Sequence, residues 1–148
     1  LMSEKPVVFA LSNPTPELFP EEVREVKPNA IIGTGRSDFP NQINNVLGFP
    51  FIFRGALDVK ARKINMEMKK AAAYAIAELA KKDVAEHVTE IFGDLSYGED
   101  YIIPKPFDKR LMVHVSSAVA QAAVETGVAR EDNWDLEAYR EELASKIS

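Results

Sequence analysis

Two short apolar runs constrain the fold of this chain more than any other feature. Residues 7–11 (Val-Val-Phe-Ala-Leu) and 30–33 (Ala-Ile-Ile-Gly) are continuous and rich in β-branched side chains, which is typical of strands buried on both faces of a parallel sheet. Between them, residues 20–25 predict a short helix with proline in its first turn and acidic residues near its positive end. Strand, helix and strand over so short a stretch predict one right-handed βαβ unit.

The segment after this unit is predicted to be helical. A helical stretch is expected after Pro40 and through residues 44–47, and residues 51–59 predict a second helix or turn. The apolar side chains around the start of that second element are predicted to lie in the core rather than to stack on a cofactor. They are Phe49, Phe51, Ile52 and Phe53.

A long amphipathic helix is predicted next. Asn65 is a good N-cap for it, and Lys81 and Lys82 are expected in its last turn, where the dipole favours cations. Its apolar side chains recur at helical spacing and should form one packed face. They are Met68, Ala72, Ala75 and Leu79.

The last third of the chain contains a predicted loop and two predicted helices. Residues 83–99, which include Gly93 and Gly98, predict a polar loop whose role the sequence leaves open. A helix over about residues 111–126 should end at Gly127. A final helix is expected from a cap at Asn133 or Asp135 to Ile147, with an apolar stripe. The stripe consists of Leu136, Tyr139, Leu143 and Ile147.

Composition and charge exclude several classes of function. The chain has 148 residues, enough for one domain, and no cysteine, which excludes disulfides, thiolate metal sites and cysteine nucleophiles. Residues 131–148 carry −4 of the formal net charge of −5, and no basic stripe exists to bind nucleic acid. No apolar run is long enough to cross a membrane, and no signal peptide is recognisable, so the cytoplasm is the expected compartment.

Two strands are too few for a complete sheet, because isolated two-stranded sheets are rarely stable. The chain also begins almost directly at a strand, so we expect an incomplete α/β sheet whose open edge another polypeptide segment covers. A small helical domain with a marginal pair of strands is the alternative. The dinucleotide-binding motif is not complete here, because Gly33-Thr34-Gly35 is followed by Asp38 at the position of the third glycine.

Three asparagines are the candidate binding residues. Asn13 follows the first predicted strand, and Asn44 and Asn45 follow the second. A carboxamide donates and accepts hydrogen bonds without charge, and ligands of open α/β sheets bind at the carboxyl ends of the strands. Each asparagine alone is also a common turn or cap residue. His87 and His114 have no metal-site spacing, and they are interpreted as surface or packing residues.

Long sequence motifs resemble the malic enzymes in their compact prokaryotic form. The resemblance covers nearly the whole chain, and two motifs carry it most strongly. They are residues 9–17 (Phe-Ala-Leu-Ser-Asn-Pro-Thr-Pro-Glu) and residues 34–50 (Thr-Gly-Arg-Ser-Asp-Phe-Pro-Asn-Gln-Ile-Asn-Asn-Val-Leu-Gly-Phe-Pro). Further matching runs are residues 53–59, 68–72, 101–104 and 123–130.

The resemblance implies a fold and a reaction. The fold is α/β: the later half of a Rossmann-like nucleotide-binding domain with few parallel strands, followed by C-terminal helices, and incomplete on its own. Residues 1–148 would be the C-terminal part of that domain, with closing helices from about residue 111 onward. Malic enzymes oxidise (S)-malate with NAD or NADP and decarboxylate the product to pyruvate and CO2, using Mg2+ or Mn2+ as a Lewis acid.

The resemblance also implies the site residues. Asn13 and Asn45 would contact substrate, and Asn13, Asn44 and Asn45 would contact the nicotinamide end of the cofactor. Gly33, Thr34 and Gly35 would lie near the cofactor. No catalytic residue and no metal ligand can be carried over onto this chain, because the family's proton donor, lysine base and acidic ligands precede it. Its tyrosines therefore inherit no role in proton donation: Tyr74, Tyr97, Tyr101 and Tyr139.

Several functional interpretations stay open at this point. In the first, the chain is one part of an oxidoreductase that an N-terminal remainder completes, and a homo-oligomer of two or more copies is implied. In the second, it is a non-catalytic fragment or nucleotide-binding module without turnover. A third interpretation, a domain like that of amino-acid dehydrogenases, is disfavoured by the two long motifs. The choice between NAD and NADP depends on a region that precedes this chain.

Overall fold

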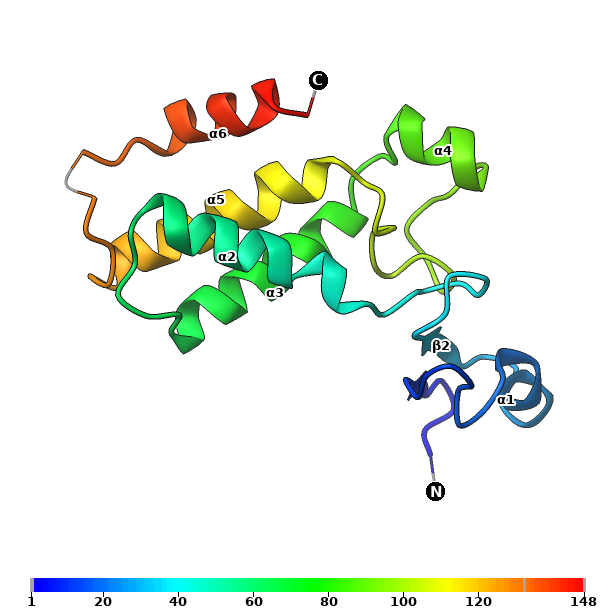
Figure 1. Ribbon diagram of the computed structural model, residues 1–148. Helices are drawn as coiled ribbons and strands as arrows, with labels where there is room; N and C mark the ends of the chain where they lie inside the picture. The colour runs from blue at the N-terminus through cyan, green and yellow to red at the C-terminus, as the bar shows by residue number, and fades with distance from the viewer. Residues whose placement is uncertain (1, 132, 148) are drawn as a thin grey trace. The chain divides into compact units, whose positions relative to one another are not determined.

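The computed structural model describes residues 2–131 and 133–147 and divides into two compact units (Figure 1). The first, the strand unit, comprises residues 1–44 and 80–105. The second, the helical unit, comprises residues 45–79 and 106–148. No helix among the described residues is both long and apolar enough to cross a membrane.

The predicted βαβ unit is confirmed in the strand unit. Strand β1 (Val7–Ala10), helix α1 (Pro20–Val26) and strand β2 (Ile31–Thr34) follow one another, and the two strands pair in parallel. Their register runs from Val7 opposite Ile31 to Ala10 opposite Thr34. Val23 of α1 packs with Ala30, Ile32 and Val8, so α1 covers one face of the sheet.

The expectation that β1 is buried on both faces is wrong for the described residues. On one face of β1, Val8 is partly buried and Ala10 is fully buried. On the other face, Val7 and Phe9 are 56% and 50% exposed. Side chains alternate between the faces of a strand. An apolar run therefore has one face bare wherever only one layer packs on the sheet.

Residues 83–99 are not only a loop, as the sequence predicted, but contain helix α4 (Glu86–Phe92). Its seven residues are too few for a helical periodicity to stand out. Val88 is its buried residue, and Gly93 ends it with a φ of 77°. Phe92 lies under the ammonium of Lys105, 5.0 Å from the ring centroid, and burial lowers the pKa of that lysine.

Asn41 joins the loop after β2 to the segment after α4. Its side chain is buried, and its Nδ2 donates to the carbonyl oxygens of Ile32 (2.9 Å) and Glu99 (2.7 Å). Its Oδ1 accepts from the backbone N–H of Ile102 at 2.9 Å. The backbone of Asn41 has a φ of 54°, a left-handed conformation that asparagine tolerates better than most residues.

The helical unit consists of one 3₁₀ helix and α-helices. They are η1 (Asn45–Leu47), α2 (Phe49–Asp58), α3 (Met66–Ala80, of which the last residue belongs to the strand unit), α5 (Arg110–Glu125) and α6 (Leu136–Ser145). Helices α2 and α5 lie side by side (Figure 1). Gly55 allows this approach, because a Cβ there would overlap the Ser116 carbonyl oxygen and lie 3.0 Å from Val119 Cβ.

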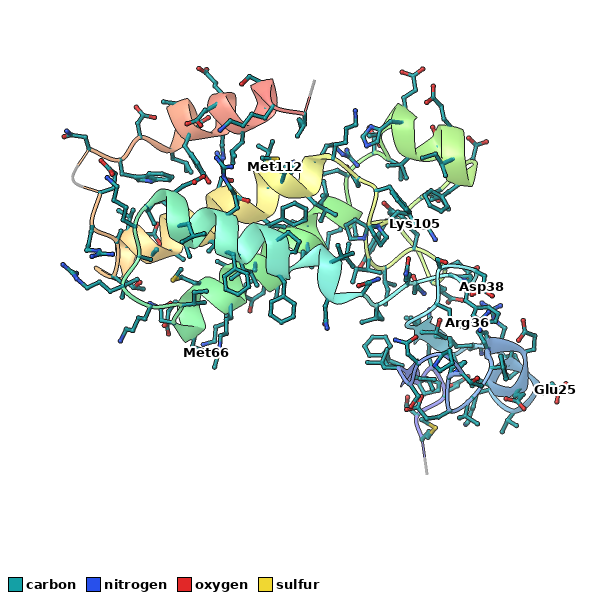
Figure 2. The ribbon with its side chains drawn as sticks, in the orientation of Figure 1. Glu25, Arg36, Asp38, Met66, Lys105 and Met112 are labelled. Carbon is teal, nitrogen blue, oxygen red and sulfur yellow. The ribbon has the colours of Figure 1, made fainter. Side chains whose placement is uncertain are left out.

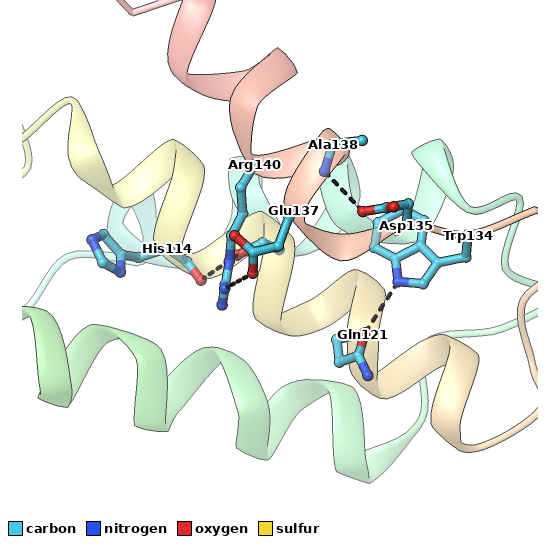
Figure 3. A network of polar contacts seen from close by, with 8 residues as sticks. His114, Gln121, Trp134, Asp135, Glu137, Ala138 and Arg140 are labelled. Carbon is cyan, nitrogen blue, oxygen red and sulfur yellow. Dashed lines mark hydrogen bonds and ion pairs between the residues drawn. The ribbon is translucent and has the colours of Figure 1, made fainter.

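Polar contacts fasten α6 to α5 (Figure 3). The indole N–H of Trp134 donates to the side chain of Gln121 at 3.1 Å. Arg140 Nε of α6 donates to Ser117 Oγ of α5 at 3.4 Å, and within α6 its Nη1 pairs with Glu137 at 2.7 Å. Beneath them, Tyr139 and Leu143 of the predicted apolar stripe are buried.

The predicted helix ends are confirmed in three places. Asn65 Oδ1 accepts from the backbone N–H of Met68 at 2.9 Å, as expected for the cap of α3. Gly127 follows α5 with a φ of 68°. Of the two candidate caps for α6, Asp135 is the one that bonds, accepting from the N–H of Ala138 at 2.9 Å (Figure 3).

Three other predictions for these helices are wrong. The stretch after Pro40 is irregular until η1 begins at Asn45, so it holds a single 3₁₀ turn. Lys81 and Lys82 lie beyond the end of α3 rather than in its last turn.

The third wrong prediction concerns two phenylalanines of α2. Phe49 and Phe53 are 53% and 51% exposed and stack on each other, with ring centroids 6.2 Å apart, instead of entering the core. The buried side of α2 is the one that carries Gly55 and Ala56, and Gly55 packs directly on α5.

The contact between α2 and α5 predicts the effect of a single methyl group. Gly55→Ala should lower the free energy of unfolding by about 1–3 kcal/mol, because an added methyl in a packed contact forces the helices apart. Urea unfolding followed by circular dichroism measures this. Gly98→Ala is the control, since a Cβ there would meet nothing closer than the Ser96 carbonyl oxygen at 3.9 Å. Equal midpoints for Gly55→Ala and the unchanged protein would contradict the tight contact.

The buried carboxamide of Asn41 makes a second prediction. Asn41→Asp keeps the shape of the side chain but removes the donors to two carbonyl oxygens, which would then face a carboxylate. We expect a loss of about 2–3 kcal/mol in the free energy of unfolding, the cost of leaving buried polar groups unpaired. The same measurement on Asn29→Asp, an exposed residue of the same unit, controls for the added charge. If both variants unfold alike, the network around Asn41 contributes nothing.

Candidate functional site

The structure brings Asn13 and Gly35 together at one edge of the sheet. Because β1 and β2 are parallel, their carboxyl ends meet at the same edge, and the loops that carry Asn13 and Gly35 begin there. A Cβ on Gly35 would lie 3.2 Å from Asn13 Nδ2 and 3.3 Å from Asn13 Oδ1. The carboxamide of Asn13 therefore rests on the backbone of Gly35, in a space that a larger residue would fill.

The loop around Asn13 holds its neighbours but leaves its carboxamide open. The backbone N–H and hydroxyl of Ser12 both donate to the Glu17 carboxylate, at 3.1 and 2.6 Å. The Ser12 hydroxyl lowers the pKa of Glu17, which keeps this acceptor ionised. The Asn13–Pro14 peptide bond is cis. Asn13 itself is exposed, and its side chain makes no hydrogen bond to any of the described residues.

Arg36 bridges the two loops at this edge. Its Nε and Nη2 donate to the two carboxylate oxygens of Asp38 at 2.8 and 2.7 Å, and its Nη1 donates to the carbonyl oxygen of Pro14 at 3.2 Å. The side chains of Arg36 and Asp38 lie next to each other (Figure 2). The guanidinium lies 5.6 Å from the centroid of the Phe39 ring. Its hydrogen bonds to Asp38 lower the pKa of that carboxyl, so the pair stays charged at neutral pH.

Gly33 and Thr34 lie beneath this surface rather than on it. Thr34 is fully buried, and its hydroxyl accepts from the backbone N–H of Arg36 at 3.2 Å. A Cβ on Gly33 would lie 3.0 Å from both Ile43 Cγ1 and Phe9 Cδ1. Both residues are buried under the loop that follows β2 and support its backbone by packing and hydrogen bonding. Their part in cofactor binding stays a prediction.

Asn44 and Asn45 are both exposed, as a ligand-binding role requires. Asn44 is the last residue of the first segment of the strand unit, and Asn45 is the first residue of the helical unit. The carbonyl oxygen of Asn45 accepts from the N–H of Gly48 at 3.0 Å, which closes η1 and fixes the backbone that carries its side chain.

The sequence reasoning missed the residues that support the site. Arg36, Asp38 and Glu17 all lie inside the two motifs, but a motif does not say which of its members bond to each other. An arginine and an aspartate two positions apart in a loop, and a serine and a glutamate flanking a proline pair, were the available signals. The role of Asn41 had no signal, because its partners lie 58 and 61 residues away.

A separate polar cluster surrounds Asp58 in the helical unit. No group of three or more His, Asp or Glu side chains in residues 2–131 and 133–147 is placed to hold a metal ion. The hydroxyl of Tyr139 donates to Asp58 at 2.6 Å, and the same carboxylate accepts from Arg54 Nε at 2.5 Å. Burial, together with the Asp58 carboxylate, raises the pKa of Tyr139, so this tyrosine is a structural donor.

Residues 1–99 match the model of the malic enzyme NAD-binding domain. The chain is 57% identical over 148 residues to the NADP-dependent malic enzyme of Escherichia coli, a match that covers 99% of this chain and 20% of that protein. It is 53% identical over 144 residues to the NAD-dependent malic enzyme of Rhizobium meliloti, covering 96% of this chain and 19% of the relative.

Solved structures give the same relationship in three dimensions. The malic enzyme of Pyrococcus horikoshii superimposes with a TM-score of 0.83 at 43% identity, over 99% of this chain and 30% of that one. The malic enzyme of Entamoeba histolytica superimposes with a TM-score of 0.85 at 38% identity, over 99% of this chain and 27% of that one.

The chain thus spans between 19% and 31% of the length of the curated relatives that it matches. Its two parallel strands and its helices are a part of a larger α/β fold with a Rossmann-like nucleotide-binding domain, as the sequence predicted. On the family match over two thirds of its length and on the identity of its relatives, the chain belongs to the malic enzyme family.

Proposed function

We propose that the protein containing this chain oxidises (S)-malate and decarboxylates the product to pyruvate and CO2, with reduction of NAD or NADP. The observation that supports this most is the carboxamide of Asn13. It is exposed and unbonded at the carboxyl edge of the parallel strands, while its two neighbours in the chain are held by hydrogen bonds. That edge is the ligand-binding side of open α/β sheets.

Neutral amides suit the ligands of this reaction. The N–H groups of Asn13 and Asn45 can donate to a malate carboxylate, and their carbonyl oxygens can accept from the carboxamide of nicotinamide. We propose that Asn44 contributes to the nicotinamide side, and that Gly33, Thr34 and Gly35 set the loop under it. Amides add no charge that competes with a cation bound to the same substrate, so they orient malate without disturbing the charge balance of the site.

The exposed carboxamides at these positions support cofactor binding, because the carboxamide of nicotinamide can both donate to and accept from them. When bound, the nicotinamide would supply hydride-accepting chemistry. The described residues of this chain offer no cluster of metal ligands, so we propose that residues outside the chain hold the Mg2+ or Mn2+ that malic enzymes use. The function of this chain in that enzyme is to bind and orient.

We propose that residues 1–148 form the C-terminal part of the nucleotide-binding domain, with closing helices from about residue 111 onward. Two observations support this division: the family model matches residues 1–99, and α5 begins at Arg110. We further propose that an N-terminal remainder of the same enzyme covers the bare face of β1, where Val7 and Phe9 are half exposed. A homo-oligomer in the cytoplasm belongs to the same proposal.

A direct test begins with the polypeptides present. A denaturing mass spectrum of the purified protein is followed by an assay with malate, Mn2+ and either NAD or NADP, read as reduced nicotinamide at 340 nm. Malate-dependent reduction by a species larger than this chain supports the proposal. A single 16.5 kDa species without turnover would instead identify a non-catalytic fragment.

Asn13→Ala is expected to reduce kcat/KM for malate by about tenfold or more, because it removes one or two oriented hydrogen bonds to ligand, together about 1.5–3 kcal/mol. Steady-state kinetics with malate varied at saturating cofactor measures the loss. Asn29→Ala, an exposed asparagine of the same unit, should leave kcat/KM unchanged. A full rate in Asn13→Ala would remove this residue from the site.

Asn45→Ala should cause a loss of similar size, about tenfold or more in kcat/KM, for the same reason. The matched variant is Asn133→Ala, an exposed asparagine of the helical unit. Thermal unfolding of both variants separates a binding defect from a folding defect. If Asn45→Ala loses activity only in proportion to a lowered melting temperature, its side chain supports η1 and does not touch ligand.

A further inference from the structure

Arg36, next to the candidate site, makes more hydrogen bonds than is usual for an exposed arginine. Exposed ion pairs are ordinarily mobile and contribute little. Arg36, by contrast, uses three of its nitrogens at once: Nε and Nη2 on Asp38, and Nη1 on the carbonyl oxygen of Pro14. The planar guanidinium therefore has one fixed orientation, set by the two-point contact with Asp38.

The elements on either side restrict Arg36 further. Its backbone N–H donates to the fully buried hydroxyl of Thr34, so the residue is anchored at the end of β2. Phe39 lies against the guanidinium, and the ring of Phe39 in turn meets Phe19 edge-on, with centroids 6.2 Å apart. A side chain fixed at its backbone, its head group and its face is suited to hold something else in place.

What Arg36 holds is the residue after Asn13. The Pro14 carbonyl oxygen accepts from Nη1, while on the other side of Asn13 the N–H and hydroxyl of Ser12 are bonded to Glu17. The residues on both sides of Asn13 are thus held by hydrogen bonds, whereas the Asn13 carboxamide makes none to the described residues. Preorganisation of this kind lowers the entropy that a ligand must remove on binding.

We propose that Arg36, oriented by Asp38, is a positioning residue that fixes the Pro14 backbone and thereby presents the Asn13 carboxamide to its ligand. The inference rests on the proposed function for the identity of that ligand. Arg36 acts through Asn13 and does not touch substrate or cofactor itself. Its removal should therefore affect catalysis only as long as Asn13 is present.

The first experiment is a double-mutant cycle on the complete enzyme. Arg36→Ala should lower kcat/KM for malate by about fivefold or more in the otherwise unchanged enzyme, but by less than about twofold in the Asn13→Ala background, because two residues that act as one unit are not additive. Asp38→Asn, which keeps the arginine and releases its orientation, should show the same dependence on Asn13. An equal fold-loss in both backgrounds would overturn the inference.

The matched control is Arg24→Ala. Arg24 also pairs with an aspartate of the strand unit, Asp100, at 2.7 Å, and it is similarly exposed. Removing it deletes the same charge and the same type of ion pair without contact to either loop. It should leave kcat/KM unchanged in both backgrounds, and a loss equal to that of Arg36→Ala would mean that net charge, not positioning, is responsible.

A second measurement does not depend on turnover. Hydrogen–deuterium exchange, read by mass spectrometry on a peptide covering residues 11–19, reports the opening of the Asn13 loop. Arg36→Ala should raise the exchange rate there by about fivefold or more, since each local opening then breaks one contact fewer, and Arg24→Ala should not. Unchanged exchange in Arg36→Ala overturns the positioning role. An enzyme inactive on malate would reject the proposed function, yet the exchange result would still decide whether Arg36 fixes this loop.

Discussion

The parallel pairing of β1 with β2 is the constraint on which the candidate site depends. Val7 lies opposite Ile31 and Ala10 lies opposite Thr34, so both strands end at the same edge of the sheet and level with each other. That register brings the carboxamide of Asn13 onto the backbone of Gly35, although the two residues are 22 positions apart. A shift of the register by one residue would turn every side chain of β1 to the other face and separate the two loops.

The same sheet shows how much of the fold lies outside this chain. One face of β1 packs under α1, and the other presents Val7 and Phe9 at about half exposure. Two strands with one bare apolar face are a weak structure alone, and the chain matches only 20% of the length of several relatives. The site therefore combines a locally well-determined loop pair with a sheet that needs further layers to be stable.

The sequence predicted elements whose signals lie in adjacent residues. It failed where contacts with distant residues determine the structure. The βαβ unit, the Asn65 cap and the stop at Gly127 each follow from a few adjacent residues, and all are confirmed. Exposure of Phe49 and Phe53 could not be predicted, because the buried side of α2 is chosen by α5 through Gly55. Helix α4 was missed for its shortness, and Asn41 because its bonds reach residues far along the chain. The binding roles of Asn13, Asn44 and Asn45 stay predictions, since they rest on the place of these residues after the strands and on the resemblance.

The two sequence motifs form the candidate site through contacts that cannot be read from either motif alone. Within residues 34–50, Gly35, Arg36 and Asp38 are three neighbours with three different tasks: one makes room for the Asn13 carboxamide, one bonds the residue after it, and one orients the arginine. The first motif contributes the matching parts, Ser12 and Glu17, on the other side of Asn13. The two motifs therefore come into contact through the pairing of the strands. The Asn13 carboxamide, which we propose as a ligand contact, lies between these bonded residues and makes no hydrogen bond to any described residue.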